Sequence, residues 1–119
     1  MNEFLINVEE TSKKLKEGKI LLIDVREQDE ARIAKIEGSK LFPLRDLPAK
    51  LDEIKKLLEK ASAKGSAKGL DKEVVVYCHH GFRSQFGAEF LRKAGIKARS
   101  MAGGIDEWSK KIDKSTPEY

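Results

Sequence analysis

Residues 74–84 read VVVYCHHGFRS and join an apolar run to a short polar loop. Four consecutive apolar residues, Val74 to Tyr77, are typical of a strand that is buried on both faces of a parallel sheet. A helix is expected to begin near Ser84, so the loop leads from the end of a strand into a helix N-terminus. Open α/β sheets bind their ligands at the carboxyl ends of such strands. The stretch therefore predicts an α/β fold and places the functional site in this loop.

Cys78 is the only cysteine of the chain and stands directly after the apolar run. A free cysteine often acts as a small buried apolar residue, but such a residue would lie within the valine run and not one step beyond it. The thiolate is the reactive form, and a helix N-terminus and a nearby cation such as Arg83 both favour it. We therefore predict that Cys78 is a nucleophile with an exposed sulfur.

The rest of the chain alternates short apolar runs with amphipathic segments. Strands are expected at residues 4–6, 20–23, 74–77 and 96–101, with a further short strand within 38–44. Helices are expected over residues 8–17, 27–33, 47–60, 84–94 and 105–112. This alternation predicts an α/β domain with a mainly parallel sheet that is covered by helices on both faces.

The length of 119 residues fits a single domain, expected over residues 1–119 with its core at about 4–112. Residues 61–70 are mostly small and include two glycines, which indicates a mobile loop within the domain. Residues 113–119 are expected to form a tail with little to hold it.

Composition excludes several classes of partner. The net charge is +4, but the lysines alternate with acidic residues along helix faces, which is the pattern of a solvated surface. There is no basic stripe with interleaved aromatic residues, so nucleic acid is not expected as a partner. No apolar stretch approaches the ~20 residues that cross a bilayer, so no membrane is expected either. A single cysteine and an N-terminus without a signal-peptide pattern predict a cytoplasmic location.

Four separated segments resemble the rhodanese domain, in order and at fitting spacing. They are LIDVR at residues 22–26, GSKLFPL at 38–44, YCHHGFRS at 77–84 and MAGGIDEW at 101–108. The resemblance covers nearly the whole chain and implies a rhodanese-like α/β fold with a central parallel sheet of about five strands. It also implies a sulfurtransferase that takes a sulfane sulfur from thiosulfate or a related donor as a persulfide on Cys78 and passes it to cyanide or a thiol. No cofactor is expected.

The chemistry of a persulfide gives roles to the residues of the loop. A persulfide is anionic near neutral pH, so successive backbone amides from His79 to Ser84 are expected to point at it. Gly81 allows the chain to turn with a positive φ, and Arg83 offers a cation to an anionic donor. Phe82 is expected either to line the mouth of the site or to pack beneath the loop, and the sequence leaves both arrangements open.

Other polar residues near the loop receive structural roles. His79 and His80 are adjacent, so their side chains are expected to point apart, and no second cysteine or further histidine completes a zinc site. No metal is therefore expected, and the two histidines are predicted to contribute amides and a modest positive potential. The resemblance implies that Asp24 and Arg26, at the end of a strand, organise the structure near the loop.

Two alternatives are weighed against the sulfurtransferase. Cysteine phosphatases that share the rhodanese fold use Cys-x5-Arg, whereas Cys78 and Arg83 form Cys-x4-Arg. The shorter loop makes a tighter cradle, suited to one sulfur atom, so phosphatase activity is not favoured. The second alternative is a sulfur-carrier module that docks a protein partner and turns over slowly. With no second cysteine, a persulfide on Cys78 must pass to an outside acceptor such as cyanide, glutathione, thioredoxin or the cysteine of a partner protein.

Overall fold

The computed structural model of the chain describes residues 3–63 and 72–119 and contains a five-stranded sheet. The strands lie in the order β1-β5-β4-β2-β3, and each neighbouring pair is parallel. Their bounds are Leu5–Ile6 for β1, Ile20–Asp24 for β2, Lys40–Leu41 for β3, Glu73–Tyr77 for β4 and Ala98–Met101 for β5. The predicted parallel sheet of about five strands is therefore confirmed.

The central strand β4 separates two hydrophobic cores. All of its residues are buried, and its three consecutive valines are of the β-branched type that suits a pleated, buried surface. Because side chains alternate along a strand, Val74 and Val76 enter one core whereas Val75 and Tyr77 enter the other. Tyr77 pairs with Asp24, so β4 and β2 end at the same level.

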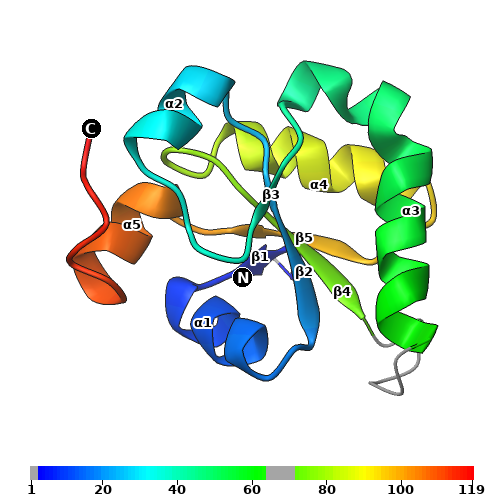
Figure 1. The fold of residues 1–119 in the computed structure, drawn as a ribbon, viewed down its shortest axis with the longest axis horizontal. Coiled ribbons are helices and arrows are strands. Elements are labelled where there is room, and N and C mark those ends of the chain that lie inside the picture. The colour runs from blue at the N-terminus through cyan, green and yellow to red at the C-terminus, as the bar shows by residue number, and fades with distance from the viewer. Residues whose placement is uncertain (1–2, 64–71) are drawn as a thin grey trace.

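Helices cover both faces of the sheet, as predicted. Their bounds are Val8–Lys16 for α1, Gln28–Ile33 for α2, Leu47–Ala63 for α3, Arg83–Lys93 for α4 and Gly104–Lys111 for α5, with a short 3-10 helix η1 at Leu44–Asp46. The core on one face is completed by α3 and α4, and the core on the other face by α1 and α5 (Figure 1). Trp108 packs in this second core and anchors α5. None of the helices among the described residues has the length and apolar composition that crossing a membrane requires.

The best-patterned helix of the sequence is longer than predicted. Leu47 and Ile54 of α3 are buried in the first core, which confirms the apolar face. The helix continues to Ala63 because alanine and serine do not break a helix. The mobile loop predicted for residues 61–70 is therefore wrong at its start, and residues 64–70 lie outside the described residues.

The C-terminal segment, residues 113–119, contradicts the prediction of a tail with little to hold it. Thr116 is buried, and its carbonyl accepts a hydrogen bond from the hydroxyl of Ser109 in α5. The side chain of Tyr119 reaches Arg26, whose Nη1 donates to the phenolic oxygen at 2.6 Å. These partners are far away in the sequence or depend on the folded position of α5, so the composition of the segment does not reveal them.

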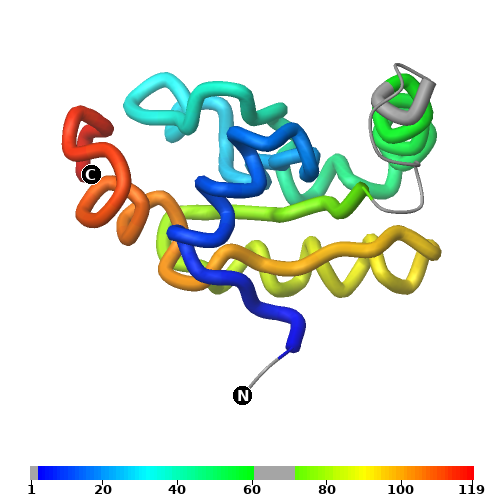
Figure 2. Tube along the Cα trace, turned by 90° about the horizontal axis from the view of Figure 1, so that it is seen from below, coloured from blue at the N-terminus to red at the C-terminus, as the bar shows by residue number. Residues whose placement is uncertain are grey.

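Three segments gather at the end of the molecule where β2 and β4 terminate. They are the loop from β4 to α4, helix α2 and the C-terminal segment, all of which lie at the left in both views (Figures 1 and 2). The turn into α5 joins them at the same end (Figure 1). The residues that the sequence singled out are therefore brought together at the carboxyl edge of the sheet, where parallel sheets bind ligands.

Candidate active site

Cys78 follows the last residue of β4 and lies at the floor of the loop, where it is only 1% exposed. Its Sγ accepts hydrogen bonds from the backbone N–H groups of Gly81 at 3.1 Å and Ser84 at 3.4 Å. The thiol also lies 3.4 Å from Ser84 Oγ, which is 2.7 Å from Ser100 Oγ. Backbone dipoles aimed at one atom favour a negative charge on it. The sulfur is buried and not exposed as predicted, because the loop closes around it.

The turn of the loop depends on Gly81. Its φ of 100° confirms the predicted positive value, which residues with a Cβ rarely adopt. A Cβ at this position would lie 3.1 Å from the backbone nitrogen of Gly103. Gly81 therefore serves two purposes, since it reverses the chain to aim its own N–H at Cys78 and lets the loop pack closely on the turn before α5.

The N-terminus of α5 holds the loop from outside. The backbone N–H of Ile105 donates to the carbonyl of Cys78 at 2.9 Å, and that of Asp106 donates to the carbonyl of His79 at 3.1 Å. This approach requires Gly104, because a Cβ there would lie 2.5 Å from the Cys78 carbonyl oxygen. The first amides of a helix have no partner within the helix, and here two of them fix the first residues of the loop.

Arg83, which is predicted to offer a cation to an anionic donor, is paired with an acidic side chain. It is the first residue of α4, which begins one residue earlier than expected, and its guanidinium donates to both carboxylate oxygens of Glu30 at 2.8 Å each. The hydrogen bonds from Arg83 lower the pKa of Glu30 from 4.5 to about 2, although partial burial opposes the shift. The same bonds raise the pKa of Arg83. Its charge is therefore balanced by Glu30, and its side chain fastens the end of the loop to α2.

The side chains of His79 and His80 stack on each other and do not point apart as predicted. Their ring centroids are 3.9 Å apart at an angle of 28°. The ring of Tyr119 also stacks on His79, at 3.9 Å and 6°. Two rings at this distance cannot share one face of an imidazole, so His79 lies between them. Burial, and secondarily His80, lower the pKa of His79. This favours a neutral ring and weakens the positive potential expected of it.

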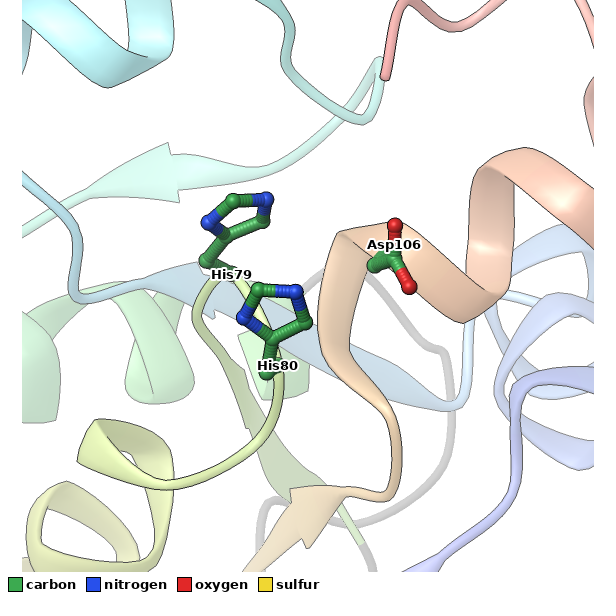
Figure 3. A group of neighbouring side chains, drawn as sticks. All are labelled: His79, His80 and Asp106. Atoms are coloured by element: carbon green, nitrogen blue, oxygen red, sulfur yellow. The ribbon is translucent and has the colours of Figure 1, made fainter. Parts of the chain in front are cut away.

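His79, His80 and Asp106 form a group that offers three metal-ligand atoms, all within 4.8 Å of one another (Figure 3). The Nε2 atom of His79 is buried without a hydrogen-bond partner in the described part of the chain. Ligands of a tetrahedral zinc ion lie roughly 3.4 Å apart, given metal–ligand distances of about 2.1 Å. Stacked rings also direct their nitrogens side by side, and Asp106 accepts a hydrogen bond from Lys110 at 3.0 Å. An ion at this group would compete with Lys110 for the carboxylate of Asp106.

Asp24 and Arg26 form a buried ion pair behind the loop. Arg26 is 0% exposed, and its Nε and Nη2 atoms donate to the two oxygens of Asp24 at 2.9 and 2.8 Å. Burial opposes the charge of Arg26, but the hydrogen bonds that it donates to Asp24 and Tyr119 outweigh this effect and raise its pKa. The hydroxyl of Tyr77 donates to Asp24 at 3.1 Å, and burial raises the pKa of Tyr77 to about 12. The organising role of Asp24 and Arg26 stays a prediction, and the pairing of Asp24 with Tyr77, the residue before Cys78, agrees with it.

Phe82 does not pack beneath the loop, because it lies on the surface with 74% of its area exposed. That it lines the mouth of the site stays a prediction. The ring of Phe86, in the first turns of α4 and also exposed, is 6.1 Å away. Together with Gln85 and Glu89 they line a pocket of about 240 Å³. An exposed aromatic pair thus lies at the junction of the loop that surrounds Cys78 and helix α4.

Comparison with known proteins gives the family. The family model described as the rhodanese-like domain matches residues 7–111. The chain belongs to the rhodanese-like domain family. It is 34% identical to the rhodanese-like/PpiC domain-containing protein 12, chloroplastic, of Arabidopsis thaliana, over 96% of this chain and 36% of that protein. It is 38% identical to a putative thiosulfate sulfurtransferase, mitochondrial, of Schizosaccharomyces pombe, over 77% of this chain and 65% of that protein.

Solved rhodanese-like structures agree with the fold. The human single-domain sulfurtransferase TSTD1 is 27% identical to this chain, with a TM-score of 0.68, and the match covers 92% of this chain and 98% of that one. The curated relatives are longer: this rhodanese-like domain spans about a third of the plant protein and just under two thirds of the yeast protein.

Sequence reasoning missed three residues of this rhodanese-like site. Glu30 and Tyr119 contact the loop from α2 and from the C-terminal segment, and Gly104 permits the approach of α5. The sequence around Glu30 indicates only a local role, because Glu30 completes the capping box of α2 with Glu27. Gly103 and Gly104 are adjacent in the sequence, but such a pair predicts a turn and not a contact of Gly104 with the loop.

The close packing of α5 on the loop predicts the effect of adding one methyl group. Gly104→Ala should reduce the free energy of unfolding by more than about 2 kcal/mol, since it adds a clash with the loop to the strain of a positive φ. Gly95→Ala is the matched control, because Gly95 has a φ of 88° but nothing within 4 Å of the added Cβ, and it should cost about 1 kcal/mol. Urea unfolding measures both. An equal loss of unfolding free energy in the two variants would contradict the role of Gly104 in packing α5 on the loop.

The Glu30–Arg83 pair predicts a pH-dependent contribution to stability. The folded pKa of Glu30 lies below its ordinary value of 4.5, so the stabilisation is present above about 4.5 and is lost as the pH falls toward about 2. Glu30→Gln should therefore be less stable than the wild type at pH 7, by about 1 kcal/mol because water screens the half-exposed Arg83. The difference should shrink steadily below pH 4.5. Glu37→Gln, at an exposed residue, is the control, and a difference that is independent of pH would contradict the pairing.

Proposed function

We propose that this rhodanese-like domain is a sulfurtransferase that takes a sulfane sulfur from thiosulfate, or a related donor, as a persulfide on Cys78 and passes it to cyanide or a thiol. The observation that carries the proposal is the pair of backbone N–H groups, of Gly81 and Ser84, on the single sulfur of Cys78. Dipoles fixed in this way stabilise a sulfur anion without reorganisation during the reaction. The names of the yeast and human relatives, both sulfurtransferases, support the same reading.

The reaction balances in two displacement steps. In the first, the Cys78 thiolate attacks the outer sulfur of thiosulfate, a sulfur–sulfur bond forms, and sulfite leaves with the electron pair of the broken bond. In the second, the acceptor attacks the outer sulfur of the persulfide and Cys78 leaves as the thiolate. With cyanide the product is thiocyanate. Neither step needs an oxidant, a reductant or a cofactor.

The surroundings of Cys78 support sulfur transfer over phosphate-ester hydrolysis. A phosphatase of this fold needs an arginine that is available to the phosphate, whereas both terminal nitrogens of Arg83 are bonded to Glu30. The loop amides reach the sulfur itself, so the space that they enclose is centred on Cys78 and not on a group beyond it. An anionic donor would therefore interact mainly with the backbone amide dipoles of the loop, and not with an unpaired guanidinium group.

Substitution of the nucleophile tests the proposal in the steady state. Cys78→Ser keeps the shape of the side chain but lacks the thiol, so cyanide-dependent thiocyanate formation should fall by at least about a hundredfold. Circular dichroism of the variant checks that the fold is retained. Wild-type protein should in addition show no hydrolysis of p-nitrophenyl phosphate. A Cys78→Ser protein with near wild-type turnover would rule out the mechanism.

A second candidate is a sulfur-carrier domain whose acceptor is a protein thiol, and the exposed pair Phe82 and Phe86 favours it. Aromatic residues are enriched in protein interfaces, and these two lie on the loop and helix that surround a sulfur with almost no exposed surface. Cyanide is small enough to need no such surface. A protein acceptor would bring its thiol to the loop while an apolar side chain covers the pair.

Acceptor preference separates the two candidates. Phe82→Ser should lower the rate of transfer to the protein thiol of reduced thioredoxin relative to the rate of transfer to cyanide, and the ratio of the two should fall about fivefold. Ile33→Ser, which removes another exposed apolar side chain outside the pair, is the control and should leave the ratio unchanged. If Phe82→Ser changes both rates by the same factor, the surface is not used for a protein acceptor.

A further inference from the structure

Tyr119 contacts three groups around the loop, although it lies in the C-terminal segment. Its hydroxyl accepts a hydrogen bond from Arg26 Nη1 at 2.6 Å and donates to Glu30 Oε1 at 3.2 Å. Its ring lies parallel to the ring of His79 at 3.9 Å. The sulfur-transfer reaction proposed above assigns no role to this residue.

The hydroxyl of Tyr119 is hydrogen-bonded to Arg26, a side chain that is itself held in place. Arg26 is fully buried and is held by two hydrogen bonds to Asp24 and one to the carbonyl of Ala34 at 2.6 Å. Hydrogen bonds to charged groups are among the stronger ones in proteins. The position of the Tyr119 hydroxyl is therefore fixed by Arg26, a buried residue just after β2.

The contacts of Tyr119 reach both ends of the loop. At its start, His79 lies between the rings of Tyr119 and His80. At its end, Arg83 is bonded to both oxygens of Glu30, one of which also accepts the bond from Tyr119. Between these two ends lies Gly81, whose amide bonds to the Cys78 sulfur.

We propose that Tyr119 is a positioning residue for sulfur transfer: it holds His79 through its ring and Arg83 through Glu30, and so keeps the loop in the shape that directs its amides at Cys78. The claim about the reaction rests on the proposed function, but the claim about the loop does not. Tyr119 touches neither the sulfur nor a bound donor. Its effect is to prevent the loop from opening, because a loop whose ends are free samples shapes in which the amides leave the sulfur.

Two substitutions separate the ring from the hydroxyl. Tyr119→Phe keeps the stack on His79 but loses the bonds to Arg26 and Glu30, whereas Tyr119→Leu loses both. Lys114→Gln is the matched control, an exposed residue of the same C-terminal segment. Hydrogen exchange of the amides of residues 79–84, measured on the protein without a donor, reports the opening of the loop. The rate of persulfide formation with thiosulfate, followed by intact mass, reports its consequence.

We expect exchange in the loop to be about threefold faster in Tyr119→Phe and about tenfold faster in Tyr119→Leu, and persulfide formation to slow in the same order. Exchange in β4 should stay unchanged, since a general loss of stability would accelerate it as well. Loop exchange equal to that of Lys114→Gln in both variants would overturn the proposal. Faster loop exchange with unchanged persulfide formation would overturn the positioning role. If the wild type takes up no sulfur, thiosulfate fails as the donor, and the exchange rates still decide whether Tyr119 holds the loop.

Discussion

The site depends on the direct packing of two backbone segments, the first residues of the β4–α4 loop and the N-terminus of α5. Two helix amides bind the carbonyls of Cys78 and His79, and this is possible only because residue 104 has no side chain. With its carbonyls satisfied from outside, the loop turns its own amides inward. The amides of Gly81 and Ser84 then bond to the Cys78 sulfur. One steric condition therefore links the last helix of the fold to the hydrogen bonds on its only cysteine.

The charged side chains around the loop form two ion pairs, one buried and one half-buried. The pair of Asp24 and Arg26 is buried, and such a pair is maintained only when further hydrogen bonds satisfy the remaining groups, as Tyr77 and Tyr119 do here. The pair of Glu30 and Arg83 is half-buried and lies beside the loop. Because both arginines are paired, the electrostatic support for a sulfur anion comes mainly from backbone dipoles. This arrangement suits the proposed reaction, in which an anionic donor binds and an anionic product leaves.

The fold, and the position of Cys78 between a strand and a helix, could be predicted from the sequence because their signals are local. Continuous apolar runs identify β2 and β4, helical spacing identifies α3, and a cysteine between a strand and a helix indicates the loop. The partners of the loop could not be predicted in this way. Arg83 and Glu30 are 53 residues apart, and Arg26 and Tyr119 are 93 apart, so their pairing depends on the folded chain. The single-domain extent, the cytoplasmic location and the absence of nucleic-acid partners stay predictions.

The most direct test of the account is the mass of the intact protein after incubation with thiosulfate, and again after addition of cyanide, with peptide mapping of any added mass. The account predicts a gain of one sulfur atom, located on Cys78, that cyanide removes completely. Protein with a demonstrably free thiol that gains no mass would contradict thiosulfate as the donor. A gain located on any other residue would contradict the assignment of Cys78 and of the loop that holds it.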